Sequence, residues 1–275
     1  MRRMSAGVAV LAACALVGAT PASGARFHGT AAKHWAAKIA ALGQRPAGGA
    51  HERQAGAIVR RRLAALGYDV GVQSIALPNG RRSRNVVGRT DGAPRVLIVA
   101  HMDGARGTRA ANDNASGVGA LLELARVLRG RDRIRFAALG AEERVVTGSR
   151  YHLGSRRLVR SFSRSRLLRV RFAVSLDMIG VGTRLHVRGL EAAPNRSARL
   201  ALRRARALGI RATYLEDTGQ SDHAELTRAG LPAAWMQWRW DVCWHEPCDR
   251  IRRVKHWKLG KAGRVVLAAA RRALD

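Results

Sequence analysis

The chain has 275 residues, of which 47% are hydrophobic, and it carries 50 Lys and Arg residues against 19 Asp and Glu residues. This length suits one large α/β domain, because single cores commonly stop growing near ~250–300 residues, and no internal repeat or low-complexity tract suggests another organisation. The basic residues are spread from Arg26 to Arg272, without an aromatic-interleaved stripe or a nucleic-acid-binding motif. We therefore favour a solvated basic surface over specific binding of nucleic acid. Electrostatic attraction to anionic lipid or cell-wall polymer is left open.

The first 25 residues have the pattern of a secretory signal peptide. Two arginines precede an apolar run over residues 6–19, and small residues follow it up to Ala25. That run is shorter than the ~20 residues that span a bilayer, which argues against a membrane anchor. We expect cleavage after Ala25, a domain over residues 26–275, and a secreted or periplasmic location. Lipoprotein processing at Cys14 is the weaker alternative.

Removal of this segment would leave Cys243 and Cys248, an even pair in an oxidising compartment. A local disulfide is the favoured interpretation, and a role of the thiols as metal ligands is the weaker one. The two cysteines flank His245, so a disulfide between them would fix the loop that carries this histidine.

Hydrophobic periodicity predicts an alternation of helices and strands along the rest of the chain. Helices are expected over 30–42 and 51–66, each stopped by a glycine. Strands over 68–77 and 84–89 are joined by a Pro-Asn-Gly turn, and the apolar run 95–100 is typical of a strand buried on both faces. The other expected elements are a helix at 116–128, strands at 134–139 and 170–176, a helix at 196–208, a strand at 210–214, a helix at 223–229, a strand at 233–237 and a helix at 259–273.

This alternation predicts a single three-layer α/β/α domain around a mixed, mainly parallel sheet. The segment 156–171, rich in Arg and Ser, is either an exposed loop or a basic helix. Polar residues follow three of the apolar strands, namely His101, the pair Glu142-Glu143, and Asp177. In open α/β sheets, sites collect at the carboxyl ends of the strands, so we expect the functional site there.

Taken singly, these polar residues have ordinary structural explanations. Asp113 could complement a helix dipole, the two glutamates could form a solvated turn, and His101 and Asp103 could be a hydrogen-bonded pair. Together, two histidines and three carboxylates at the ends of separate elements supply the nitrogen and oxygen ligands that zinc accepts. If one carboxylate bridges, two ions ~3.5–4 Å apart can act on both the attacking water and the carbonyl oxygen.

Six short motifs occur in the order found in a known enzyme family. They are His101-Met102-Asp103, Asn112-Asp113-Asn114-Ala115-Ser116-Gly117, Glu142-Glu143 with Gly148-Ser149, Asp177-Met178, Ser221-Asp222-His223 and His245. Over roughly residues 96–249 the chain resembles zinc aminopeptidases of the M28 peptidase family, and the ordered set is much more specific than any one motif. The resemblance implies the zinc-exopeptidase fold, also described as phosphorylase/hydrolase-like, with a sheet of about eight strands.

The resemblance also implies two zinc ions per chain. His101 and Asp177 would hold one ion, Glu143 and His245 the other, and Asp113 would bridge them. The expected reaction is hydrolysis of the N-terminal peptide bond of peptides with a free N-terminus, by a water that the two ions activate.

Two further carboxylates receive roles from the resemblance. Glu142 would be the general base and would pass the proton to the leaving amine, and Asp103 would orient a ligand imidazole. The stretch around His223 would shape the rim of the site without ligating metal. The remaining histidines have no partner motif and are interpreted as structural or exposed; they are His28, His34, His51, His152, His186 and His256.

The sequence departs from the family next to the last ligand. Trp244 stands where most of these aminopeptidases have a tyrosine that helps to hold the oxyanion, so Trp244 is a candidate oxyanion or substrate contact of different geometry. Val145 and Val146 also replace the usual Gly and Leu, which puts the shape of that loop in doubt.

Two alternative functions follow. The Trp-His pair is found in the related glutaminyl cyclases, which use one zinc, although the stretch 112–117 is closer to the two-zinc peptidases. A non-catalytic basic binding module is disfavoured, because every candidate ligand and the base are present. The sequence leaves open the substrate side-chain preference, the oligomeric state and the physiological metal.

Overall fold

The computed structural model describes residues 25–146 and 149–275. The expected signal peptide up to Gly24, Cys14 and Gly148 lie outside the described residues. The strands are β1 (Asp69–Ala76), β2 (Arg82–Arg89), β3 (Val96–His101), β4 (Ile134–Leu139), β5 (Phe172–Leu176), β6 (Arg184–Gly189), β7 (Thr213–Glu216) and β8 (Ala233–Arg239). The helices are α1 (Gly29–Ala40), α2 (Ala50–Ala65), α3 (Ser116–Val127), α4 (Leu153–Val159), α5 (Arg164–Leu167), α6 (Arg196–Ala207), α7 (His223–Arg228) and α8 (His256–Leu274), and an irregular turn, η1 (Ala111–Ala115), precedes α3.

The eight strands form one mixed sheet in the order β1-β2-β4-β3-β5-β8-β6-β7. The four neighbours β4, β3, β5 and β8 are parallel to one another. Antiparallel pairs join β1 to β2, β2 to β4, and β6 to β8, whereas β6 and β7 are parallel. The predicted fold is confirmed, and the parallel strands bring their carboxyl ends to one edge of the sheet.

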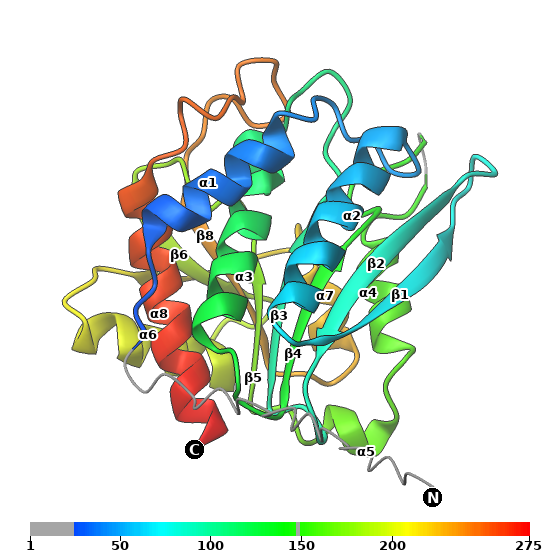
Figure 1. Cartoon of the computed structure of the whole chain (residues 1–275). Coiled ribbons are helices and arrows are strands. Elements are labelled where there is room, and N and C mark those ends of the chain that lie inside the picture. Colours follow the sequence, from blue (N-terminus) through cyan, green and yellow to red (C-terminus); the bar gives the residue numbers. More distant parts are fainter. Residues whose placement is uncertain (1–24, 147–148) are drawn as a thin grey trace, which may run out of the picture.

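Helices cover both faces of the sheet (Figure 1). Helices α1, α2, α3, α6 and α8 pack against one face in the larger apolar core, and α4 and α7 pack against the other face in a smaller core. Every residue of β3 and β5 is buried. Successive side chains of a strand point to opposite faces, so Ile98 joins the larger core and Leu97 the smaller one. The continuous apolar runs in the sequence have this origin.

Strand β6 was not predicted from the sequence, and β7 was predicted to begin earlier than it does. β6 was not predicted because it carries Arg184, His186 and Arg188 among its six residues, a composition that resembles a loop. Its apolar residues Leu185 and Val187 nevertheless alternate with these polar ones and reach the larger core. β7 begins at Thr213, later than expected.

The segment 156–171 is helical in part, since it contains the end of α4 and all of α5. Among the described residues, the model has no helix with the length and apolar character needed to cross a membrane.

Candidate active site

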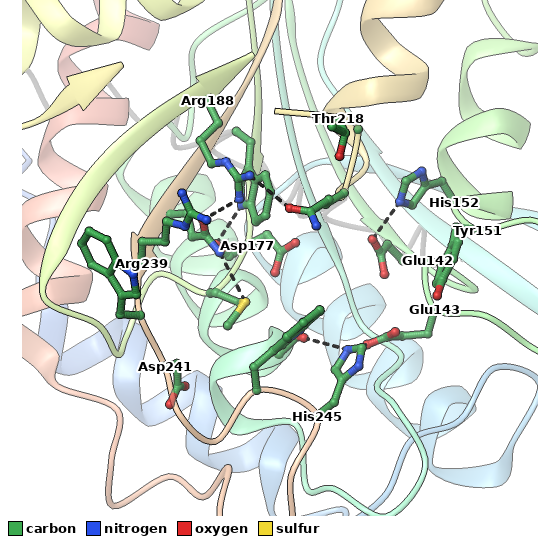
Figure 2. A pocket seen from close by; sticks show the side chains of 18 residues that line it. Glu142, Glu143, Tyr151, His152, Asp177, Arg188, Thr218, Arg239, Asp241 and His245 are labelled. Carbon is green, nitrogen blue, oxygen red and sulfur yellow. Dashed lines mark hydrogen bonds and ion pairs between the residues drawn. The ribbon is translucent and has the colours of Figure 1, made fainter. Parts of the chain in front are cut away.

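The sequence-predicted ligands all follow one of the four adjacent parallel strands. They are His101 at the end of β3 and Asp113 in the turn η1 after it, Glu143 after β4, Asp177 after β5, and His245 in the loop after β8. The strand order alone therefore brings five residues that are distant in the sequence to one edge of the sheet. Figure 2 shows several of them around a common cavity.

Three of these residues form a first set of potential metal ligands. His101 Nε2 lies 3.1 Å from Asp113 Oδ1 and 3.4 Å from Asp177 Oδ1, and all three residues are buried. Within the described part of the chain, neither ring nitrogen of His101 makes a hydrogen bond, and Asp177 Oδ1 makes none either. Buried polar atoms are nearly always partnered, so converging atoms without partners indicate a place for a ligand.

The second set shares one residue with the first. His245 Nε2 lies 3.0 Å from Glu143 Oε1 and 3.3 Å from Asp113 Oδ2. Asp113 therefore directs one carboxylate oxygen to His101 and the other to His245. This is the arrangement that a bridging carboxylate requires.

Both sets fit zinc. Imidazole nitrogens and carboxylate oxygens bind zinc at about 2.0–2.2 Å, so ligand atoms around one tetrahedral ion lie about 3.3–3.6 Å apart. Within each set, the candidate ligand atoms all lie within 4.8 Å of one another. The donor types and their spacing thus agree with the metal that the sequence predicted.

The carboxylates of this cluster favour a cation among them. Burial tends to raise the pKa of Asp113, but the adjacent rings of His101 and His245 outweigh it and hold the pKa below its usual value. Burial tends to lower the pKa of His245, but Asp113 and Glu143 raise it to about 10. The carboxylates therefore stabilise positive charge among them, as imidazolium or as a metal ion.

Glu142 belongs to neither ligand set and faces the same cavity. Burial raises its pKa well above the usual value, His101 opposes this, and the carboxylates of Glu143, Asp222 and Asp177 raise it further. A carboxyl group with a raised pKa beside a metal site is suited to proton transfer near neutral pH.

His152 holds Glu142 from the side away from the ligands. Its Nε2 lies 3.1 Å from Glu142 Oε1 (Figure 2). Burial, together with the charges of His223 and His101, lowers the pKa of His152 to about 3, so the ring is neutral at pH 7. The sequence interpretation, which grouped His152 with structural or exposed histidines, missed this contact because no motif surrounds the residue.

Asp103 fixes the backbone that carries the base and one ligand. Its two oxygens accept the N–H groups of Glu142 at 3.2 Å and Glu143 at 3.1 Å, and Oδ1 lies 3.6 Å from His101 Nδ1. At this separation the carboxylate is near the ring without a hydrogen bond to it, so orientation of the imidazole by Asp103 stays a prediction. The hydrogen bonds to the backbone of the two glutamates are a contact that the sequence did not predict. The two glutamates are also not a solvated turn, because they are only 5% and 8% exposed.

Asp249 supports Asp113 in a similar way. It accepts the N–H groups of Asn112 at 2.7 Å and Asp113 at 3.1 Å, and it is buried. No sequence motif points to this residue, which is more than a hundred positions away from its partners.

The loop that carries His245 is closed by the predicted disulfide between Cys243 and Cys248. Trp244 is 52% exposed and lines the cavity, and its ring centroid lies 4.4 Å from that of His245. Trp244 is thus an exposed part of the cavity wall beside His245 of the second ligand set.

Removal of both cysteines is expected to weaken the second set selectively. In a Cys243→Ser/Cys248→Ser variant the loop is free to move His245, and loss of a group that orients a metal ligand typically costs about 10–100-fold in affinity. Competition with a chromophoric chelator measures the affinity of each zinc. Equal weakening of both zincs, or no weakening, would contradict a specific role of the disulfide at His245.

Left-handed backbone conformations occur beside several ligands. Ala141, Met178 and His245 have φ values of 53°, 54° and 59°. Such conformations cost non-glycine residues about 1–3 kcal/mol and persist where the surrounding structure imposes them. They reverse the chain directly after strands β4 and β5, and within the loop after β8, so that the ligands face the cavity.

The cavity itself has a volume of about 480 Å³, which is in the usual range for small-molecule sites. One part of its wall contains Asp113, Glu142, Glu143, Asp177 and His245. The remainder includes Met178, Arg188, Thr218, Gln220, Trp235, Gln237, Arg239 and Trp240. Candidate ligands, base and an adjoining pocket thus form one continuous space.

Comparison with known proteins shows which proteins this chain resembles. Aminopeptidase YwaD of Bacillus subtilis (strain 168) is 31% identical over an alignment of 192 residues, which covers 65% of this chain and 41% of that protein. The chain therefore spans about two fifths of the length of this curated relative.

Solved structures share the fold at lower identity. BSAP, a zinc aminopeptidase from Bacillus subtilis, superposes with a TM-score of 0.83 at 20% identity and covers 90% of this chain and 95% of its own. The glutaminyl cyclase of Porphyromonas gingivalis gives 0.79 at 23% identity, with 90% and 98% covered. At these identities the likeness shows the fold alone.

A family comparison covers most of the described chain. The model of peptidase family M28 matches residues 85–270, the region that contains every candidate ligand and Glu142. By this match, the chain belongs to peptidase family M28.

Proposed function

We propose that this chain is an exported, zinc-dependent aminopeptidase that hydrolyses N-terminal peptide bonds with two zinc ions and with Glu142 as general base. The observation that carries the proposal is the position of Asp113, which offers one oxygen to each of two complete ligand sets. Membership in family M28 and the relative named as an aminopeptidase support it.

The metal centre would be held by residues from four strand ends. His101, Asp113 and Asp177 would hold one zinc, and Asp113, Glu143 and His245 the other. When bound, zinc lowers the pKa of water and polarises a carbonyl group.

Glu142 is the residue that moves the proton. It accepts a proton from the attacking water and delivers it to the nitrogen of the leaving amine, for which its raised pKa is suited. His152 restrains the carboxylate, and Asp103 fixes the peptide unit that carries it. Glu142, a carboxylate of the cavity wall that would hold no metal, can attract the free N-terminal ammonium group of the substrate.

Export and surface attraction complete the proposal. The disulfide between Cys243 and Cys248 supports a location outside the reducing cytosol, and the formal net charge of +31 supports attraction to anionic surfaces. N-terminal sequencing of the protein from culture medium tests the cleavage after Ala25, with lipidation at Cys14 as the competing outcome.

Metal content and turnover together test the enzymatic function. We expect two zinc ions per chain and release of N-terminal residues from aminoacyl anilides, lost on chelation and restored by zinc. The same assay includes a peptide with an N-terminal glutamine, because the pair Trp244-His245 is also the pattern of glutaminyl cyclases. One zinc with pyroglutamate formation would replace the proposal with a cyclase, and chelator-insensitive turnover would refute a metal mechanism.

A further inference from the structure

Arg188 is a buried cation in the wall of the cavity. It lies on β6, is only 4% exposed and lines the cavity. Its guanidinium carbon lies 4.1 Å from the ring centroid of Trp235. Nη1 donates to Gln237 Oε1 at 2.8 Å and Nη2 donates to Gln220 Oε1 at 3.1 Å (Figure 2). The guanidinium is thus held in place by an aromatic face and two neutral amides.

The charge of Arg188 has no hydrogen-bonded carboxylate within the described residues. Asp217 Oδ2 lies 3.7 Å from Nε, and Nε makes no hydrogen bond in the part of the chain that the structure describes. The carboxylate of Asp217 instead contacts His223 Nε2 at 2.9 Å and accepts the backbone N–H groups of Gly219 and Gln220. A guanidinium has five N–H donors, and the amides of Gln220 and Gln237 occupy only two of them.

Burial without such a partner is costly for an ion. It lowers the pKa of Arg188, an effect that attraction by Asp217 and Asp177 partly opposes. Arg239 lines the same side of the cavity and adds a second positive charge. The cost would be offset if a ligand brought a carboxylate to Arg188.

The cavity is therefore polarised. Figure 2 shows Arg188 and Arg239 on one side, and Glu142, Glu143 and His245 on the other. A suitable occupant has an ammonium group for Glu142, which would hold no metal, and, a short distance away, a carboxylate for the basic side. The planar fork of a guanidinium matches the two oxygens of a carboxylate.

We propose that Arg188 binds a carboxylate of the substrate, so that the enzyme prefers peptides with an acidic group close to the N-terminal amine. This inference rests on the proposed aminopeptidase function. Two substrates supply the required chemistry: a peptide with N-terminal Asp or Glu, through its side chain, and a dipeptide, through its C-terminal carboxylate.

Anilides of single amino acids test the side chain, because they have no C-terminal carboxylate. We expect kcat/KM to be about tenfold to a hundredfold higher for the glutamyl than for the glutaminyl anilide, since a hydrogen bond to a charged group has about this effect. Arg188→Gln should remove the preference, so that this variant hydrolyses the glutamyl and glutaminyl anilides with kcat/KM values within about threefold of each other. Arg188→Lys, which keeps the charge, should retain part of it.

Arg184→Gln is the matched control. Arg184 lies on the same strand, is exposed and does not line the cavity, so this variant changes the net charge equally and should keep the full preference. Loss of the preference in Arg184→Gln as well would mean that general charge, and not Arg188, selects the substrate. Melting temperature and zinc content show whether each variant is folded.

The dipeptide Leu-Gly and its C-terminal amide test the second source of the carboxylate. A preference for the free acid that depends on Arg188, without a preference for glutamyl over glutaminyl anilide, supports carboxylate binding by Arg188 and assigns the carboxylate to the C-terminus. Equal rates within both pairs of substrates in the unaltered protein overturn the proposal without the need for any variant.

Calorimetric binding of free L-glutamate and L-glutamine to the zinc-loaded protein separates this inference from the proposed function. Tighter binding of glutamate that is lost in Arg188→Gln supports the inference even if no anilide is hydrolysed, in which case the aminopeptidase function fails alone. The inference about Arg188 is refuted if glutamate and glutamine bind equally and the rates within both substrate pairs are equal. If leucyl anilide is hydrolysed in that case, the proposed aminopeptidase function still holds.

Discussion

Glu142→Gln is expected to lower kcat by about 10²–10⁴-fold while the protein retains its zinc. The amide of glutamine has nearly the same size but cannot accept the proton of the attacking water, and general acid–base catalysis contributes about this factor. Glu142 belongs to neither ligand set, so the metal content should not change. Steady-state hydrolysis of an aminoacyl anilide and zinc analysis of the same preparation measure the two effects.

The exposed residue Glu216 on β7 provides the control, because Glu216→Gln removes the same charge outside the cavity. It should leave kcat unchanged. Turnover of Glu142→Gln within a few-fold of the unaltered protein would eliminate Glu142 as the base. A parallel loss of zinc would instead show that Glu142 helps to hold the metal.

Asp113→Asn should cause a loss of metal, unlike Glu142→Gln, and we expect a fall in activity of about 10³-fold or more. The variant removes the carboxylate charge that contacts both histidines of the two sets. Stabilisation by a metal ion supplies several kcal/mol to hydrolysis, where each 1.36 kcal/mol is a factor of ten. Zinc per chain after dialysis against metal-free buffer, followed by kcat/KM, measures both losses.

Asp177→Asn is the informative comparison, since Asp177 belongs to the first set alone. It should weaken one zinc and spare the other, whereas Asp113→Asn should weaken both. If Asp113→Asn kept two tightly bound zinc ions, or if the two variants lost the same single ion, Asp113 could not be the bridge.

Most of the fold follows from local sequence features. The uninterrupted apolar runs of β3 and β5 predict strands covered on both faces, and the helices between them predict parallel connections. β6 escaped prediction because its buried polar residues contact partners on other elements, such as Gln237 on β8 for Arg188. Burial of a polar side chain depends on tertiary contacts that the local pattern does not contain.

The candidate ligands could be predicted from the sequence because they occur as an ordered set of motifs. The residues that support these ligands could not be predicted in this way. His152 acts through its contact with the side chain of Glu142, and Asp249 through two hydrogen bonds with the backbone of Asn112 and Asp113, which are distant from it along the chain. The left-handed backbone conformation of His245 could not be predicted from the sequence either, because residues other than glycine seldom adopt it.

The position of β8 has a consequence for the order in which the protein is completed during synthesis. β8 is the last strand in the chain, yet it lies between β5 and β6, which are made before it. The first ligand set is present once Asp177 has been added, whereas His245 follows its partner Glu143 by 102 residues. A growing chain that ends before β8 therefore contains Glu142 and the residues of the first ligand set. Its sheet lacks the strand between β5 and β6, and its second ligand set lacks His245. By this order, the second set of candidate ligands is complete only after β8 has been made and can join β5 to β6 in the sheet.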